Sequence, residues 1–333
     1  MPPCPFLPEL TNMNILITSA GQRVSLIRAF QKELKSFFPE AKVFATDMNP
    51  ELSPACYVAD KCFQVKKVTA AEYIDDLLQL CKENNVKMVV PTIDTELLIL
   101  AGNKHLFEAE NIHVIVSSYA FVDKCRDKRK TMTFFRERGI EVPAVIDKRH
   151  PTFPLFIKPY NGSLSADTYL ISSPEDLKEY HLQNERFLFM EYINKNNHDE
   201  YTVDMYYDRK HNVKCVVPRL RLFVRAGEIN KGMTARNVLV PYLKEKMCHI
   251  KGAVGCLTVQ FFLNKVTERI VAIEINPRFG GGFPLSYCAG ANYPQWLIKE
   301  YFFNEKIEYT EDWENRLLML RYDDEIIVHA NNS

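Results

Sequence analysis

The sequence predicts a mixed fold, in which a Rossmann-like α/β domain with a parallel sheet is followed by an α+β domain. From residue 13 to about residue 118, short runs rich in β-branched residues alternate with segments of helical periodicity. Strands that alternate with helices imply right-handed crossovers and a parallel sheet. After Ser118, paired strands and hairpin turns dominate and helical segments are few, which is typical of α+β architecture. We therefore expect the domain boundary near residues 119–125.

Each segment of the first domain has the periodicity of one element. Short apolar runs predict strands at residues 14–18, 42–47, 86–92 and 112–118. Apolar residues at helical spacing predict helices at residues 24–37, 70–85 and 94–110. A Ser-Ala-Gly turn separates the first strand from the first helix. This order of strands and helices is the one expected for a Rossmann-like domain.

The composition is typical of a soluble globular protein. Apolar residues make up 47% and charged residues 25% of the 333 residues. The 42 Lys and Arg side chains balance the 42 Asp and Glu side chains, so no global field attracts nucleic acid or anionic lipid. No apolar run approaches the roughly 18 to 20 residues needed to cross a membrane. We expect neither a nucleic acid nor a membrane as partner.

The cysteines and the N-terminus indicate a cytoplasmic protein. Nine cysteines are scattered without a CxxC motif or zinc-ligand spacing, and several lie in apolar runs. They are expected to be reduced thiols in the core. Residues 1–12 are rich in proline and lack a basic region, so they do not resemble a secretory signal. They are either a flexible N-terminal extension or sequence upstream of a start at Met13.

A lysine and a loop of small residues follow an apolar strand in the second domain. Lys158 lies at the end of the strand and Pro159 stops its ladder. The loop contains Asn161, Gly162, Ser163, Ser165 and Ala166. Small residues let backbone N–H groups approach phosphate oxygens, and the lysine adds a compact positive charge. The alternative is an ordinary hairpin with a lysine at the strand end.

Carboxylates stand at the ends of two further strands. Glu191 ends an apolar strand and is followed by Tyr192 and Ile193, while Glu200 and Asp204 lie near the start of the next strand. The Glu191 carboxylate and the adjacent backbone groups are able to bind an adenine edge. Glu200 is able to accept hydrogen bonds from ribose hydroxyls. Simple solvation of these carboxylates is the alternative.

Basic side chains are concentrated in the segment that follows. They are Arg219, Arg221, Arg225, Lys231 and Arg236. A solvated basic face is one interpretation of this segment. Because the whole chain is neutral, a local cluster of bidentate donors instead favours recognition of phosphate or carboxylate.

Polar residues also interrupt two apolar strands joined by a turn. Glu274, Asn276 and Arg278 stand at alternate positions before three glycines, so they share one face of their strand. Gln260 on the preceding strand is expected to lie near Glu274 in an antiparallel hairpin, with the register left open. Oxygen ligands from Gln260, Glu274 and Asn276 suit Mg2+, which completes its octahedron with water and phosphate oxygens. A merely polar hairpin face is the weaker alternative, because both strands have apolar flanks.

The order of these motifs resembles the ATP-grasp superfamily. The motifs are a helical lysine (Lys128), the lysine strand with its small-residue loop, the Glu191 segment, the basic segment, the Gln260 strand and the run from Glu274 into the glycines. The likeness is greatest to single-chain proteins related to the ATP-binding half of the carbamoyl-phosphate synthase large subunit, and it extends from about Asn14 to about Tyr309. It implies an ATP-grasp fold in the second domain. The expected domains are a flexible extension at 1–12, a Rossmann-like domain at 13–120, an ATP-grasp domain at 121–310 and a C-terminal segment at 311–333.

The resemblance also implies a role for each candidate residue. ATP would be bound by Lys128, Lys158, Gly162, Ser163, Ser165, Glu191, Tyr192, Ile193 and Glu200. Mg2+ would be bound by Gln260, Glu274 and Asn276. The catalytic candidates are Arg278, which would clamp the transferred phosphate, together with Arg225 and Arg219. The cofactors implied are therefore ATP and Mg2+.

The reaction implied is that of an ADP-forming carboxylate–amine ligase. A substrate carboxylate attacks the γ-phosphate, and an amine or other nucleophile then captures the acylphosphate. The expected partners are a small-molecule carboxylate and an amine or other nucleophile, and a homodimer is left open. One departure motivates an alternative, because Leu164 and Asp167 stand where the family's loop has glycines. The alternative is a catalytically impaired nucleotide-binding or regulatory protein.

Overall fold

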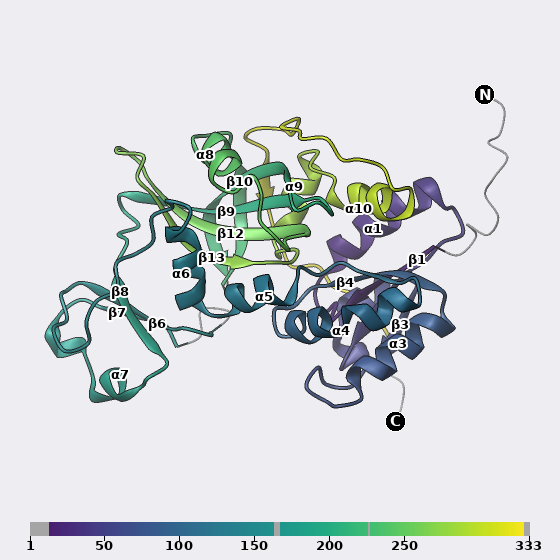
Figure 1. Ribbon diagram of the computed structural model, residues 1–333, viewed down its shortest axis with the longest axis horizontal. Helices are drawn as coiled ribbons and strands as arrows, with labels where there is room; N and C mark the ends of the chain where they lie inside the picture. The colour runs from purple at the N-terminus through teal and green to yellow at the C-terminus, as the bar shows by residue number, and fades with distance from the viewer. Residues whose placement is uncertain (1–12, 163–166, 226, 330–333) are drawn as a thin grey trace. The chain divides into compact units, whose positions relative to one another are not determined.

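The computed structural model describes residues 13–162, 167–225 and 227–329 (Figure 1). The chain divides into two compact units. The first consists of Met1–Tyr119, Asn292–Glu308 and Arg321–Ser333, and the second of Ala120–Ala291 and Tyr309–Leu320. The expected domain limits kept residues 121–310 together, whereas this division assigns Asn292–Glu308 to the first unit. Segments far apart in the sequence therefore contribute to each unit.

The first unit is built on a parallel sheet, which has five strands among the described residues, in the order β3-β2-β1-β4-β5. The strands are β1 (Asn14–Thr18), β2 (Val43–Asp47), β3 (Lys61–Gln64), β4 (Val86–Pro91) and β5 (His113–Val114). The α-helices are α1 (Val24–Phe37), α2 (Pro54–Val58), α3 (Tyr73–Glu83), α4 (Leu97–Ala109) and α10 (Tyr293–Phe302), and Pro50–Leu52 forms a 3-10 turn. The predicted Rossmann-like parallel sheet is confirmed.

Apolar burial explains how this unit holds together. Every residue of β1 is buried, as expected for a central parallel strand covered on both faces. Helix α1 buries an apolar stripe that includes Ile27, Phe30 and Leu34. Helix α10 packs against α1, where Gln295 Nε2 donates to Glu33 Oε2 at 3.2 Å. A helix from the far end of the chain thus completes the first unit.

The short helix α2 and the strand β3, which lie between β2 and α3, were not predicted, and they change the prediction for the cysteines. Strand β3 is short and partly exposed at the sheet edge, and α2 has only five residues, so neither has a clear periodicity. A disulfide joins Cys56 of α2 to Cys62 of β3, whose Cα atoms are 5.0 Å apart. Cys248 and Cys288 are exposed free thiols. The expectation that the cysteines are reduced core thiols is therefore wrong for these four residues.

The second unit contains two antiparallel sheets (Figure 1). Among the described residues the larger has the order β13-β12-β9-β10-β11-β14 and the smaller the order β7-β6-β8. The strands are β6 (Leu155–Pro159), β7 (Tyr169–Ile171), β8 (Phe187–Glu191), β9 (His198–Tyr207), β10 (Val213–Arg225), β11 (Glu228–Thr234), β12 (Gly255–Asn264), β13 (Ile270–Asn276) and β14 (Leu318–Leu320). The α-helices are α5 (Tyr119–Arg126), α6 (Lys128–Arg136), α7 (Glu179–Gln183), α8 (Leu239–Lys246) and α9 (Phe283–Cys288), and Pro174–Asp176 forms a 3-10 turn.

Each sheet of the second unit has its own apolar packing. Strand β9 is paired on both sides, with β12 and β10, and most of its residues are buried. Helix α6 contacts β13 and α8 contacts β10. The smaller sheet is held by a separate cluster that includes Leu155, Ile157 and Phe189. Each sheet of the second unit is therefore supported by its own buried contacts, and polar side chains project from it.

None of the helices in the described part of the chain is long and apolar enough to span a membrane.

Candidate functional site

A row of polar side chains crosses the larger sheet from β13 to β11. The strand register places Glu274 opposite Gln260, and Gln260 opposite Thr202. Thr202 in turn faces Arg219, and Arg219 faces Thr234. Residues directly opposite one another project from the same face of a sheet, so all five share that face. The predicted proximity of Gln260 and Glu274 is confirmed.

A second polar row runs beside the first on the same face. Asn276 faces Thr258, and Thr258 faces Asp204, each two residues along its strand from the first row. The Asn276 Nδ2 atom donates to Glu274 Oε1 at 3.0 Å. The structure therefore brings together Gln260, Glu274 and Asn276.

The chemistry of these three side chains fits Mg2+. Their donors are one carboxylate and two amide oxygens, and Mg2+ prefers oxygen ligands from few protein groups. Within the described ranges no group of three or more His, Cys, Asp and Glu could hold a metal ion. The Asn276 amide donates to Glu274 here, and a half-turn of the amide would present its oxygen instead. A cation at this place would thus depend on Glu274 for its only anionic protein ligand among the three.

Two buried lysines lie close to this group. Lys158 on β6 and Lys128, the first residue of α6, are 6% and 9% exposed. Burial lowers the pKa of Lys158 to about 8; the Glu274 carboxylate raises that pKa and the Lys128 ammonium lowers it. Lys128 Nζ donates to the Gly162 carbonyl at 2.7 Å. Lys158 thus lies within electrostatic range of both Glu274 and Lys128, and Lys128 contacts Gly162.

The small-residue loop after Lys158 is only partly described. The predicted phosphate-binding residues Ser163 and Ser165 lie outside the described residues, as does Leu164. A side chain at Gly162 would meet Pro159 Cγ at 2.5 Å, so the position accepts only glycine without rearrangement. Asp167 has φ of 53°, the left-handed conformation that favours glycine.

The Glu191 carboxylate, predicted to bind the adenine edge, is held by other protein groups. Its Oε1 accepts from Arg269 Nη1 at 2.9 Å and its Oε2 accepts from the Ala144 N–H at 3.2 Å. Burial raises the pKa of Glu191, but the Arg269 guanidinium and the Ala144 amide together bring that pKa below its usual value. The Glu191 N–H also donates to the Ala144 carbonyl, at 2.8 Å. The next two residues are Tyr192, which is half-buried, and Ile193, which is buried.

Glu200, predicted to bind ribose, is also engaged by cations. Its Oε1 lies 3.1 Å from Arg221 Nε, and its Oε2 lies 3.0 Å from Lys195 Nζ. Arg221 Nη1 further donates to Thr202 Oγ1 at 3.2 Å. Arg221 thus links Glu200 to the polar row of the sheet.

The three predicted catalytic arginines have different environments. Arg219 is fully buried and grips Asp204 with two nitrogens, Nε at 2.8 Å and Nη2 at 2.9 Å. Arg225 is exposed at the end of β10, and six residues along a strand from Arg219 correspond to roughly 20 Å. Arg278 is half-buried two residues after Asn276, and its N–H donates to the Asn276 carbonyl at 2.8 Å. The structure brings Arg278 to the predicted metal ligands and places Arg225 away from Arg219.

Sequence reasoning missed Arg269. Arg269 binds both Glu191 and Glu141, and its Nε donates to Glu141 Oε1 at 2.8 Å. Glu141 is 128 residues away in the chain, so no local spacing could have indicated the contact. Asp204 was noted only as a carboxylate near a strand start, although its position two residues from Thr202 places it on the polar face.

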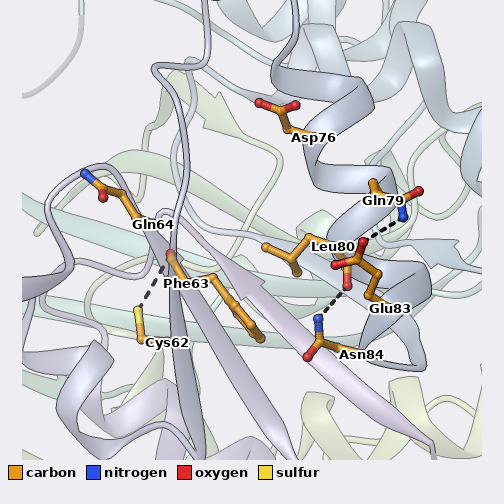
Figure 2. Close-up of a pocket in the computed structure, with 8 residues that line it drawn as sticks. All are labelled: Cys62, Phe63, Gln64, Asp76, Gln79, Leu80, Glu83 and Asn84. Carbon is orange, nitrogen blue, oxygen red and sulfur yellow. Dashed lines mark hydrogen bonds between the residues drawn. The ribbon is translucent and has the colours of Figure 1, made fainter.

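A pocket of about 450 Å³ lies in the first unit, between β3 and α3 (Figure 2). Its lining residues are Cys62, Phe63, Gln64, Asp76, Gln79, Leu80, Glu83 and Asn84. Figure 2 shows several of these groups bonded to one another, with Gln79 Nε2 donating to Glu83 Oε1 at 2.7 Å and Asn84 Nδ2 donating to the Leu80 carbonyl at 2.9 Å. None of the predicted site residues lines it. The polar face of the second unit is therefore the stronger candidate site.

Family models and a curated relative match this chain. Residues 15–115 match the model described as PylC-like, N-terminal domain, and residues 183–321 match the model described as ATP-grasp in the biosynthetic pathway with Ter operon. Carbamoyl-phosphate synthase from Methanobrevibacter smithii is 26% identical over 228 residues, which are 62% of this chain. The match spans 61% of that relative's length.

Solved structures are similar to this chain over most of its length. Biotin carboxylase from Campylobacter jejuni has a TM-score of 0.68 at 17% identity, and the likeness covers 91% of this chain and 73% of that one. The L-amino acid ligase from Bacillus licheniformis has a TM-score of 0.64 at 16% identity, covering 92% of this chain and 77% of that one. At such identities the likeness establishes the fold alone. With the family models, it confirms the prediction of a Rossmann-like domain followed by an ATP-grasp fold.

Proposed function

We propose that this ATP-grasp protein is an ADP-forming ligase, which uses ATP and Mg2+ to join a small-molecule carboxylate to an amine or another nucleophile. The proposal is carried by the placement of Gln260, Glu274 and Asn276 on one sheet face, with Lys158 near enough to Glu274 for their charges to interact. Oxygen ligands beside buried cations are the groups that a magnesium-bound triphosphate requires.

In this proposal the polar face and the lysines position the triphosphate. Gln260, Glu274 and Asn276 would hold the cation. When bound, Mg2+ supplies charge neutralisation at the phosphate oxygens. Lys158 and Lys128 would meet the phosphates from β6 and α6, and their burial strengthens each electrostatic contact.

The nucleoside would be bound by the β8 end and by Glu200. Backbone groups of Tyr192 and Ile193 would face adenine, because the Glu191 carboxylate is held by Arg269 and the Glu191 N–H donates to the Ala144 carbonyl. Glu200 would accept from the ribose hydroxyls while Arg221 and Lys195 hold its orientation. Gly162, Ser163 and Ser165 would cover the phosphates through backbone N–H groups.

Two steps complete the proposed reaction. An oxygen of the substrate carboxylate attacks the γ-phosphorus, the bond to the bridging oxygen breaks, and ADP leaves. The amine then attacks the acyl carbon of the acylphosphate, inorganic phosphate leaves, and the amine nitrogen loses a proton. Arg278 would contact the transferred phosphoryl group, because it follows Asn276 by two residues and carries bidentate donors. Arg219 would act through Asp204, whereas Arg225 lies six residues further along β10 and has no contact with the reacting carboxylate in this proposal.

A second function is favoured by one observation in the covering loop. Asp167 places a negative charge and a side chain at a position with left-handed backbone, where the family has glycine. A carboxylate near phosphate oxygens opposes nucleotide binding. The corresponding alternative is a nucleotide-binding or regulatory protein with impaired catalysis.

The test is ADP release from ATP and Mg2+ with a panel of carboxylic acids and amines, read by mass spectrometry of the products. The ligase proposal predicts ADP release that needs both a carboxylate and a nucleophile. ATP binding by calorimetry, with no ADP release from any pair, would favour the regulatory alternative instead. Light scattering of the same sample tests whether the active form is a homodimer.

A further inference from the structure

The buried carboxylate of Asp204 is a junction of four elements of the second unit. Arg219 of β10 donates from Nη2 to its Oδ1 at 2.9 Å, and Arg219 Nε lies within ion-pair distance of its Oδ2, at 2.8 Å. Ser286 of α9 donates to its Oδ2 at 2.6 Å, and Thr258 of β12 lies 3.2 Å from its Oδ1. Asp204 and Arg219 are both fully buried. A buried charge pair is tolerated best when its polar atoms are paired. The Asp204 carboxylate meets this condition through Arg219, Ser286 and Thr258, whereas Nε and Nη1 of Arg219 are buried without a hydrogen-bond partner among the described residues.

The segment from Asn276 to Phe283 is pressed against this junction. Thr258 Oγ1 lies 3.0 Å from the Arg278 carbonyl, which it can bond in place of Asp204. A side chain at Gly280 would meet Thr258 Oγ1 at 3.0 Å, and one at Gly282 would meet Arg219 Nη1 at 2.0 Å. The glycines are needed here because the backbone passes directly over the side chains of the sheet.

The segment is thus fixed at both ends of its path. The strand register with Thr258 holds Asn276 at its start, and the Ser286 hydroxyl bound to Asp204 holds α9 at its end. Arg278 lies between these two points. A shift of the Asp204–Arg219 pair would therefore move Arg278 relative to Glu274 and Asn276.

We propose that Asp204 and Arg219 form a positioning pair, which holds the Asn276–Phe283 segment against the sheet and so sets the place of Arg278 beside Gln260, Glu274 and Asn276. The inference rests on the proposed ligase function, because it assigns to this pair the alignment of that site. Neither side chain touches substrate in this proposal. Arg219 would act through the segment that covers it, since any substrate would have to displace Gly282 to reach it.

The test uses two variants and a matched control. Asp204→Asn keeps the size of the side chain and removes its charge. Ser286→Ala removes one hydroxyl from the same junction and is the milder change. The control is Asp208→Asn, because Asp208 is also buried, follows the end of the same strand, and lies 3.1 Å from Lys214 Nζ. Lys214 belongs to β10, so the control breaks an ion pair between β10 and the residue that follows β9.

We expect hydrogen exchange to separate local positioning from general destabilisation. In Asp204→Asn, amides of residues 277–287 should exchange on the order of tenfold faster, beyond any change in β6 to β8. The value of kcat should fall about 100-fold, the effect of a misplacement near 1 Å, while KM for ATP changes less than about threefold. Ser286→Ala should show the same pattern at a smaller size. Asp208→Asn should lower the melting temperature without faster exchange at residues 277–287 and without the fall in kcat.

Two results would overturn the proposal. One is an equal acceleration of amide exchange at residues 277–287 in Asp204→Asn and in the control Asp208→Asn. The other is a Ser286→Ala protein with unchanged exchange and unchanged kcat. If wild type releases no ADP with any substrate pair, the ligase function fails, whereas the exchange data still decide whether the pair holds the segment. If Asp204→Asn does not fold, Ser286→Ala decides.

Discussion

At the scale of single residues, Lys158 has the clearest electrostatic consequence. Its pKa falls to about 8 from an ordinary 10.5, mainly because of burial. We predict that ATP affinity falls as the pH rises above about 8, where Lys158 loses the charge that meets the phosphates. Calorimetric titrations between pH 6.5 and 9.5 would show this. Lys158→Gln should bind more weakly and lose the dependence, whereas Lys210→Gln, an exposed control, should behave like wild type.

The same pKa determines the sign of a stability change. Unfolded lysine keeps its proton up to about pH 10.5, while folded Lys158 loses it near pH 8. Between these values the unfolded state binds more protons, so folding stability from this group rises with pH. Urea unfolding at pH 8 and pH 10 should show a smaller rise in Lys158→Gln than in wild type. An equal rise of stability in both proteins would contradict the lowered pKa of Lys158.

Glu274→Ala should remove turnover and leave the fold intact. The carboxylate lies on the polar face and is half-buried, so its loss leaves no large apolar cavity. Activity should fall at least about 100-fold, because the cation loses its anionic protein ligand. Melting temperature and ADP release are measured together, with Glu268→Ala in the adjacent turn as control. Near wild-type turnover would show that Glu274 does not hold the metal.

Strand alternation predicted Gln260, Glu274 and Asn276 as neighbours, because paired strands close in sequence leave few registers. It could not show that Glu191 is occupied, since Arg269 reaches it from another part of the chain. The partner of Arg219 was likewise hidden, because Asp204 meets it only when β9 and β10 pair. Contacts within one hairpin can be predicted from sequence, whereas long-range ion pairs depend on the folded topology.

At the scale of elements, the junction of β1 and β4 is held by a buried carboxylate. Glu96 accepts from Thr18 Oγ1 and Ser19 Oγ, each at 2.9 Å, from the Thr92 N–H at 3.0 Å, and from the Tyr73 hydroxyl at 3.2 Å. Burial raises the pKa of Glu96 despite these donors. Ligands of open parallel sheets bind where the strand order reverses, which here is between β1 and β4. At that place the Glu96 carboxyl is buried and bonded to protein donors from the residues that follow β1 and β4.

This junction gives a pH-dependent prediction. A carboxyl whose pKa is raised on folding contributes stability that is present at low pH and lost as the pH rises through the folded value. Glu96→Gln should therefore gain stability relative to wild type as the pH rises from about 4, although the lost acceptor costs about 1 to 3 kcal/mol. Urea unfolding from pH 4 to pH 8 measures both. A constant difference across that range would contradict the raised pKa.

The loop between β6 and β7 tests the alternative function. Asp167→Gly should tighten ATP binding about tenfold, or about 1.4 kcal/mol, because a negative charge near the phosphates is removed. Asp167→Asn is the matched control, since asparagine also tolerates the left-handed backbone and differs mainly in charge. Equal gains in both variants would assign the effect to charge. Unchanged binding in both would mean that Asp167 does not face the nucleotide.

Element prediction succeeded where periodicity was long. Helices α1, α3 and α4 and strands β1, β2 and β4 were predicted near their observed limits. The strand predicted at residues 112–118 was too long, because only His113–Val114 pairs in the sheet, as β5. Short α2 and the polar edge strand β3 were missed, because five and four residues carry too little pattern. The disulfide between them was missed for the same reason, since it depends on their adjacency.

At the scale of the whole molecule, the change in pattern after Ser118 predicted two architectures, and both are present. The parallel sheet of the first unit and the antiparallel sheets of the second follow from strand order and connection length. The return of α10 to the first unit did not follow, because an amphipathic helix does not specify which core it covers. The sequence pattern also does not identify the substrates, because their recognition depends on side chains that only the folded chain brings together.

The most direct test of the central claim is the transfer of oxygen-18 from a labelled carboxylate to phosphate. The substrate is a carboxylic acid that supports ADP release, labelled in its carboxylate and supplied with ATP, Mg2+ and the amine. Attack of that carboxylate on the γ-phosphorus predicts one labelled oxygen in each inorganic phosphate formed, measured by mass spectrometry. Unlabelled phosphate during full product formation would contradict activation of the carboxylate as an acylphosphate.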